Sequence, residues 1–253
     1  MSRAGARDAD GATIVYGRRP VAEAKRGRRR VRRVWTTDDL PASELTRLAG
    51  SSDHQGFVAE VDPYPYAEPG SLLEHPEALV VALDQVQDPR NLGAVCRSAE
   101  AAGAAGVVIP SRRSASVTAV ACKASAGAVE HLRVARVPNL ADWLGQAKES
   151  GAWVYGAETS ARAVYTQADL SGMLVLVLGS EAKGLRPRVS ESCDLLVSIP
   201  VGGRVASLNV SAAAAVLLFE AARQRGGGTR TRSGPRGRKR DSATKRAPRG
   251  EGG

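Results

Sequence analysis

Between residues 78 and 225, short apolar runs alternate with stretches whose apolar residues recur at helical spacing. A chain with this alternation folds into a parallel sheet that helices cover on both faces. Ligands of such sheets lie at the carboxyl ends of the strands, so the segments after Leu83, Leu178 and Ile199 are expected to hold the site. The pattern predicts strands at 78–83, 106–110, 132–137, 153–157, 173–178 and 195–199, and helices at 92–102, 117–126, 140–148 and 208–225.

The residues before this region predict a second, smaller unit. Residues 13–61 are typical of a small α/β domain, with helices at 18–29 and 43–49 and strands at 31–37 and 57–61. Residues 62–70 contain three prolines and one glycine, which indicates a linker over 62–77. We therefore expect a large domain over 78–226, with disordered basic segments at 1–12 and 227–253.

Charge is distributed unevenly along the 253 residues. The formal charge is +8 over residues 1–33 and +9 over residues 223–253, whereas residues 34–222 carry −7. Basic ends on an acidic body indicate contacts with a polyanion, most often the backbone of RNA or DNA. The alternative is that the basic ends only keep the chain in solution.

Several classes of protein are disfavoured by what the sequence lacks. The longest apolar run, 212–219, is far shorter than the roughly 20 residues of a membrane span, and residues 1–13 contain no apolar signal segment. The three cysteines form no C-x-x-C pair and the three histidines share no ligand spacing, so we expect a cytoplasmic protein without metal. The signature loops of dehydrogenases, NTPases and serine hydrolases are also missing.

The first expected ligand loop, residues 84–98, contains Asn91 and Arg97. Asn91 follows Pro89 where a helix N-cap belongs, so capping alone would explain it. Arg97 points away from the apolar stripe of the following helix and would be either solvated or a ligand for a phosphate or a developing oxyanion.

The second and third loops carry further polar residues at strand ends. Gly179 directly follows the most apolar strand and would let a ligand approach the backbone closely, while Glu181 would either cap the next helix or orient a catalytic group. In the third loop, Ser207 would be an N-cap and Asn209 a first-turn residue if neither had another role. The residues alone thus predict an α/β ligand-binding enzyme with a polyanionic partner.

Taken together, the three loops resemble the SpoU (TrmH-type) RNA 2′-O-ribose methyltransferases of the SPOUT class. The front segment, through YGRRPV at 16–21 and HQGFVA at 54–59, is similar to the small RNA-binding domain of the bacterial 23S rRNA guanosine 2′-O-methyltransferase subgroup. The matching loop strings are DPRNLG at 88–93 with Arg97, LGSE at 178–181 with KG at 183–184, and IP at 199–200 with SLNVS at 207–211.

The resemblance implies a trefoil-knotted parallel-sheet catalytic domain preceded by a small N-terminal α/β RNA-binding domain. It also implies S-adenosylmethionine as cofactor, RNA as partner, and a homodimer with composite active sites. One position departs from the pattern, because Ala182 stands where the family usually has glycine. By motif, the implied catalytic residues are Asn91, Arg97, Glu181, Ser207 and Asn209, and the implied cofactor contacts are Gly179, Ile199 and Leu208.

The implied reaction transfers a methyl group to a ribose 2′-hydroxyl, with a guanosine of 23S rRNA as the expected target. Three alternatives stay open: a tRNA 2′-O-methyltransferase, a 23S rRNA adenosine methyltransferase that confers thiopeptide resistance, and a non-catalytic RNA-binding protein on the same scaffold. The separate front domain favours rRNA over tRNA, and the full set of implied catalytic residues favours an enzyme.

Overall fold

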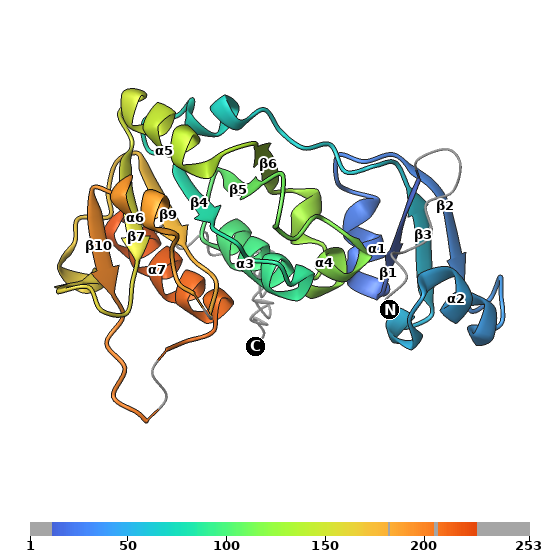
Figure 1. The fold of residues 1–253 in the computed structure, drawn as a ribbon. Coiled ribbons are helices and arrows are strands. Elements are labelled where there is room, and N and C mark those ends of the chain that lie inside the picture. Colours follow the sequence, from blue (N-terminus) through green and yellow to red (C-terminus); the bar gives the residue numbers. More distant parts are fainter. Residues whose placement is uncertain (1–11, 182, 205–206, 227–253) are drawn as a thin grey trace, which may run out of the picture.

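The computed structural model describes residues 12–181, 183–204 and 207–226, and within them the chain forms two sheets (Figure 1). The smaller sheet is antiparallel, in the order β1 (Thr13–Tyr16), β3 (Phe57–Val61) and β2 (Val31–Thr36). None of the helices in these ranges is long and apolar enough to cross a membrane.

The larger sheet has the order β6-β5-β4-β9-β7-β10-β8, and every neighbouring pair is parallel. The predicted class of fold is therefore confirmed, while the knot stays an implication of the resemblance. The strands are β4 (Leu79–Leu83), β5 (Gly106–Pro110), β6 (Arg133–Val137), β7 (Trp153–Ala157), β8 (Ala163–Val164), β9 (Leu174–Leu178) and β10 (Leu195–Ser198).

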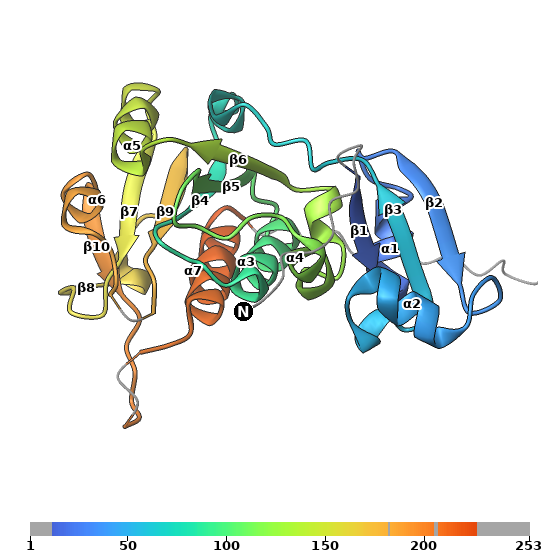
Figure 2. The same ribbon diagram turned by 45° about the vertical axis from the view of Figure 1, so that its right-hand side comes forward.

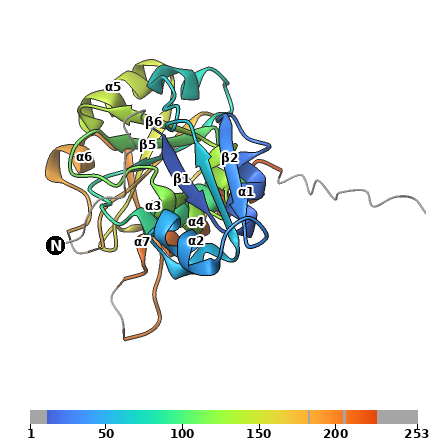
Figure 3. The same cartoon turned by 90° about the vertical axis from the view of Figure 1, so that its right-hand side faces the viewer.

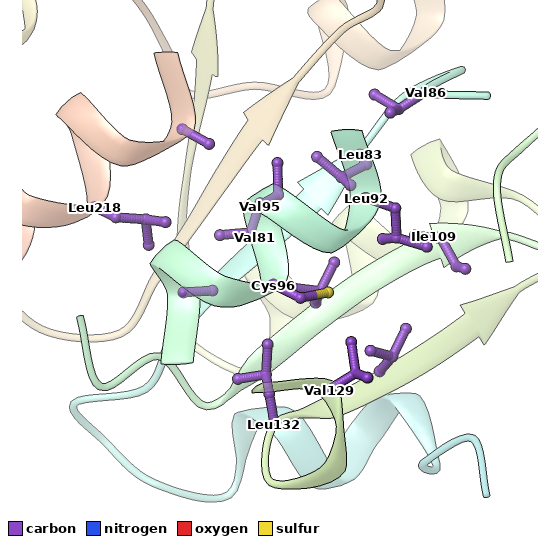
Figure 4. Packing of buried hydrophobic residues seen from close by; sticks show 14 of the residues in the cluster. Val81, Leu83, Val86, Leu92, Val95, Cys96, Ile109, Val129, Leu132 and Leu218 are labelled. Atoms are coloured by element: carbon purple, nitrogen blue, oxygen red, sulfur yellow. The ribbon is translucent and has the colours of Figure 1, made fainter. Parts of the chain in front are cut away.

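Both faces of the large sheet are covered (Figure 2). In β4, Val81 and Leu83 face the helices α3 (Pro89–Ala101) and α7 (Val210–Gln224), whereas Val80 and Ala82 face α5 (Leu140–Glu149) and α6 (Pro187–Glu191). This alternation follows from the two-residue period of a strand. Figure 4 shows the first layer, in which Leu92, Val95 and Cys96 of α3 pack on the sheet.

The small sheet carries α1 (Arg18–Ala24) and α2 (Ala42–Ala49), and Figure 3 views the molecule from this end. This front domain is attached to the large domain by buried polar contacts. Arg29 forms an ion pair with Glu130 of the short helix η3 (Ala128–Glu130), and the Tyr64 hydroxyl donates to the Val129 and Leu132 carbonyls at 3.0 and 2.9 Å. A buried charge needs a partner, so the Arg29–Glu130 pair holds the front domain against η3 of the large domain.

The linker is more ordered than its composition predicts. Its second half forms a 3₁₀ helix, η2 (Pro69–Leu73), whose Leu72 and Leu73 are buried against the α5 side of the sheet. Tyr64 is also buried, and its hydroxyl keeps hydrogen-bond partners there in the two carbonyl groups described above. Prolines thus break regular structure here without exposing the apolar side chains between them.

Several predicted helix ends were wrong. The helix expected over 18–29 ends at Ala24, before the turn that brings Arg29 to its buried partner. The side chain of Asp88, not Asn91, caps α3 by accepting from the Arg90 N–H at 2.7 Å. Asn209, not Ser207, caps α7. The remaining 3₁₀ turns are η1 (Ser52–His54) and η4 (Tyr165–Gln167), and α4 spans Ala119–Ala124.

Candidate active site

Three loops meet at the carboxyl edge of the large sheet and bring Asn91, Glu181 and Asn209 together. The Asn91 side chain donates from Nδ2 to Glu181 Oε1 at 3.1 Å. The Asn209 Nδ2 group donates to the same carboxylate oxygen and to Asn91 Oδ1, the latter at 3.1 Å. Residues 90 and 28 positions from Glu181 in the sequence thus form one hydrogen-bonded cluster.

The caps of the two helices explain why these side chains are available. Since Asp88 caps α3, Asn91 sits inside the first turn and its amide is not consumed by the backbone. Asn209 both caps α7 and joins the cluster, because its Oδ1 accepts from the Ser211 N–H at 2.9 Å while its Nδ2 donates to Asn91. Glu181 also accepts from the Val210 N–H at 3.3 Å, so its carboxylate sits at the N-terminus of α7, where negative charge is favoured.

The loop after β9 makes a turn that only glycine permits at its first position. A Cβ atom on Gly179 would lie 2.1 Å from the carbonyl carbon of Gly184. Ser180 and Gly184 close the turn, with the Gly184 N–H donating to the Ser180 carbonyl at 2.8 Å, and Gly184 has a φ of +62°. Ala182, the position that departs from the family pattern, lies outside the described residues.

An ion pair between the buried Asp84 and the exposed Arg186 anchors the far side of this loop, and it was not predicted from the sequence. The fully buried Asp84 carboxylate accepts from the Arg186 backbone N–H and from Arg186 Nε, both at 2.8 Å. Two bonds from one arginine orient the carboxylate as well as neutralise it. An aspartate immediately after an apolar strand was the available signal, but its partner lies 102 residues away.

A cavity of about 370 Å³ opens beside the Asn91–Glu181–Asn209 cluster. Its walls include all three implied cofactor contacts, Gly179, Ile199 and Leu208, together with Glu181 and Ser207. This volume lies within the roughly 300–1,000 Å³ range of small-molecule sites. The lining residues that the sequence analysis did not single out are Ala157, Glu158, Thr159, Leu178, Ser180, Lys183, Gly184, Val197, Val201, Val210 and Ala213.

Arg97 is the one implied catalytic residue that lies apart from this site within the protomer. It is exposed, and six residues separate it from Asn91, which corresponds to about 9 Å along α3 and about 120° around it. Among the described residues Arg97 forms no hydrogen bond or ion pair, and it lines a different hollow next to the front domain. Within the protomer, Glu181 therefore accepts from Asn209 and Asn91, and it does not contact Arg97.

The described ranges contain no group of three or more His, Cys, Asp or Glu side chains that could hold a metal ion. The cysteines are not nucleophiles of the site either. Burial raises the pKa of Cys122 to about 11 and that of Cys193 to about 12, and Cys96 shifts in the same direction because it is wholly buried. Thiols with raised pKa values are poor nucleophiles near neutral pH.

The fold and this site define a class: a parallel α/β protein with a cofactor-sized cavity and a polar cluster at the carboxyl edge of its sheet. The sequence profile of the SpoU rRNA methylase family matches residues 78–219. The chain belongs to this family.

The similarity to curated relatives extends beyond residues 78–219. An uncharacterized tRNA/rRNA methyltransferase of Synechocystis is 38% identical over 84% of this chain and 63% of its own length. A putative TrmH family tRNA/rRNA methyltransferase of Bacillus subtilis, YacO, is 44% identical over 75% of this chain and 78% of its own length. The chain spans about three fifths of the first relatives that it matches.

Solved structures agree over the front domain as well as the large one. The SpoU methyltransferase AviRb from Streptomyces viridochromogenes, in complex with the cofactor AdoMet, is 27% identical with a TM-score of 0.72 over 85% of this chain and 90% of that one. An RNA 2′-O ribose methyltransferase is 26% identical with a TM-score of 0.74 over 86% of this chain and 90% of that one.

Proposed function

We propose that the protein transfers a methyl group from S-adenosylmethionine to a ribose 2′-hydroxyl of RNA, with a guanosine of 23S rRNA as the target. The observation that carries this proposal is the cavity at the carboxyl edge, which holds the three implied cofactor contacts beside the Asn91–Glu181–Asn209 cluster. The similar structures with AdoMet and 2′-O ribose methyltransferase in their descriptions support the same cofactor and reaction.

The cavity fits S-adenosylmethionine by its chemistry. Leu178, Val197 and Ile199 provide an apolar wall for an adenine ring, and the strand-end backbone near them offers hydrogen-bonding groups. Two carboxylates, Glu158 and Glu181, line the same space and suit a ligand that carries a sulfonium and an ammonium group. When bound, the cofactor supplies an electrophilic methyl group.

The residues of the chain would then position the nucleophile. The ribose hydroxyl must lie in line with the methyl group at near-attack distance, and such positioning supplies much of the rate of a transfer reaction. We assign Ser207, which lines the cavity, to the ribose. Glu181 is a positioning residue, because one of its oxygens already accepts from Asn91, Asn209 and the Val210 N–H.

Arg97 would act on the RNA, either on a phosphate or on the oxygen that becomes negatively charged. Since it lies apart from the cavity of its own protomer, we propose a homodimer in which Arg97 completes the active site of the partner. Leu208, just before α7, and Phe219, on its outer face, have exposed apolar side chains, 39% and 52% accessible, that would be covered in such a dimer.

The choice of rRNA rests on the front domain. We propose residues 13–61 as an RNA-binding domain, residues 62–77 as its linker and residues 78–226 as the methyltransferase domain, with a basic RNA-contacting segment at 227–253. The curated relatives are described as tRNA/rRNA methyltransferases, so tRNA is the competing substrate.

Methyl transfer from labelled S-adenosylmethionine to protein-free large-subunit rRNA, small-subunit rRNA and bulk tRNA tests this proposal. We expect label at one 2′-oxygen of the large-subunit rRNA, located by ribose-methylation mapping. Label in tRNA would overturn the assignment of the front domain but keep the chemistry. An Asn209→Ala variant is the control, because it removes a member of the cluster.

A further inference from the structure

A second hollow, of about 560 Å³, lies where the front domain meets the large domain. Its walls come from both domains: Arg18, Arg19 and Gln55 from the front domain, and Arg97 and Lys123 from the large one. In Figure 1, α1 of the front domain lies beside α4 of the large domain at this boundary. Four of these five side chains are cationic, and no carboxylate of the described residues lines the hollow.

Two of the cations are held in place by aromatic rings. The Arg18 guanidinium lies 5.4 Å from the centre of the Phe57 ring, and the Lys123 ammonium lies 5.7 Å from that of Tyr16. Lys123 also donates to the Asp53 carbonyl at 2.6 Å, which leaves its charge uncompensated. Stacking on a ring fixes a cation without neutralising it, so the charge stays available to an anion.

Two glycines bring these groups close together. A Cβ atom on Gly17 would lie 2.8 Å from the Lys123 ammonium nitrogen, so glycine makes room for the lysine. A Cβ atom on Gly93 would lie 2.5 Å from the Ala121 carbonyl oxygen, so glycine lets α4 pack directly on α3. That packing places Lys123 of α4 and Arg97 of α3 on the wall of one hollow.

Some other exposed arginines of the chain are neutralised by carboxylates. Arg47 forms an exposed ion pair with Glu44, and Arg188 forms one with Asp142. Within the described ranges, Arg19 and Arg97 have no such partner although both are exposed. Uncompensated cations crowded in one hollow repel each other, and a polyanion would relieve that repulsion.

We propose that Arg18, Arg19, Arg97 and Lys123 form a binding site for consecutive phosphates of the RNA backbone. The site spans the two domains, so RNA bound there fixes the strand relative to α3 and delivers it towards the active site that Arg97 serves. The contact is to phosphate and is independent of base sequence. The inference rests on the proposed RNA substrate and deepens it by naming where the strand crosses the protein.

The test is the salt dependence of RNA binding by the full-length protein without cofactor. The probe is a fluorescein-labelled RNA stem-loop from large-subunit rRNA, and its affinity is measured by anisotropy over a series of KCl concentrations. Each lost phosphate contact lowers the slope of log K against log salt by about 0.7 to 0.9, which is about a five- to eightfold loss of affinity at 0.1 M salt. The Arg18→Ala/Arg19→Ala double variant should therefore lose about 25- to 60-fold.

The matched control is the Lys148→Ala/Arg188→Ala double variant, which removes two exposed and paired cations of the large domain outside the hollow. It should keep the affinity and slope of the wild type. An unchanged affinity in the Arg18→Ala/Arg19→Ala variant would overturn the site, and so would an equal loss in both variants. S-adenosylmethionine binding, measured by calorimetry, should be unchanged in both. If the wild type failed to methylate RNA while only the hollow variant lost affinity, the proposed function would fail and the phosphate site would stand.

Discussion

The cavity at the sheet edge and the hollow between the domains both contain polar side chains. Those beside the cavity have hydrogen-bond partners within the protein, whereas two cations of the hollow have no partner among the described residues. Around the cavity, Glu181, Asn91 and Asn209 bond to one another and to the start of α7. In the hollow, Arg19 and Arg97 face solvent without a partner in the described residues. The first arrangement holds its shape before a ligand arrives, and the second requires a ligand to neutralise it.

This difference indicates that the cavity suits a small cofactor and the hollow suits a polyanion. A small cofactor gains affinity when its site is already shaped, because little ordering remains to be done on binding. A long polyanion gains affinity from the counterions that it releases, and that gain requires free cations rather than a closed network. Substitutions in the two regions should therefore fail in different assays.

The largest effect is expected at Gly179. In Gly179→Ala, the new Cβ atom collides with the Gly184 backbone, so the turn must open and the cavity must change shape. We expect S-adenosylmethionine binding, measured by calorimetry, to be lost. Gly145→Ala in α5 is the control, because its Cβ atom would meet open space. A Gly179→Ala variant that binds the cofactor normally would show that the cavity is not the cofactor site.

The next largest effect is expected for Arg97→Ala, which should reduce methyl transfer without affecting cofactor binding. We expect cofactor affinity to be unchanged and methyl transfer to fall about 10²- to 10³-fold, the effect of losing one group that stabilises developing charge. Single-turnover kinetics with saturating RNA measure the step, and Arg188→Ala is the surface control. Near-normal transfer in Arg97→Ala would remove the residue from the mechanism.

Deleting residues 227–253 should have a smaller and purely electrostatic effect. The segment is strongly basic, so its loss should weaken RNA binding and flatten its salt dependence without changing cofactor affinity. Anisotropy titrations at several salt concentrations make the comparison with the full chain. The same salt slope with and without the segment would contradict an RNA-binding role for it.

The smallest effect concerns the thiols. Because burial raises the pKa of Cys122 to about 11 and that of Cys193 to about 12, both remain protonated at pH 8. We expect the native protein to react slowly with iodoacetamide at pH 8 and the urea-unfolded protein to react much faster, as followed by mass spectrometry. The raised pKa values also mean that folding stability falls once the pH rises past the unfolded thiol pKa, near 8.5. Rapid alkylation of the native protein would contradict the burial.

Much of this organisation was predictable from the sequence, because it depends on local pattern. Apolar runs of strand length predict the parallel sheet, and glycine after a buried strand predicts the close turn at Gly179. Pairings over long distances in the sequence were not predictable. Nothing near Asp84 points to Arg186, and the helix caps at Asp88 and Asn209 depend on small differences in backbone angle. That Arg97 shares a hollow with Arg18 and Arg19 likewise depends on how the two domains meet, which no local pattern encodes.

The proposed reaction places the methyl group on a ribose 2′-oxygen. The direct measurement is label transfer to a stem-loop that carries the mapped target nucleotide, compared with the same stem-loop carrying a single 2′-deoxy substitution there. We expect full transfer to the first RNA and none to the second, because the second RNA lacks the nucleophile. Equal labelling of both would place the methyl group on the base and contradict the proposed reaction.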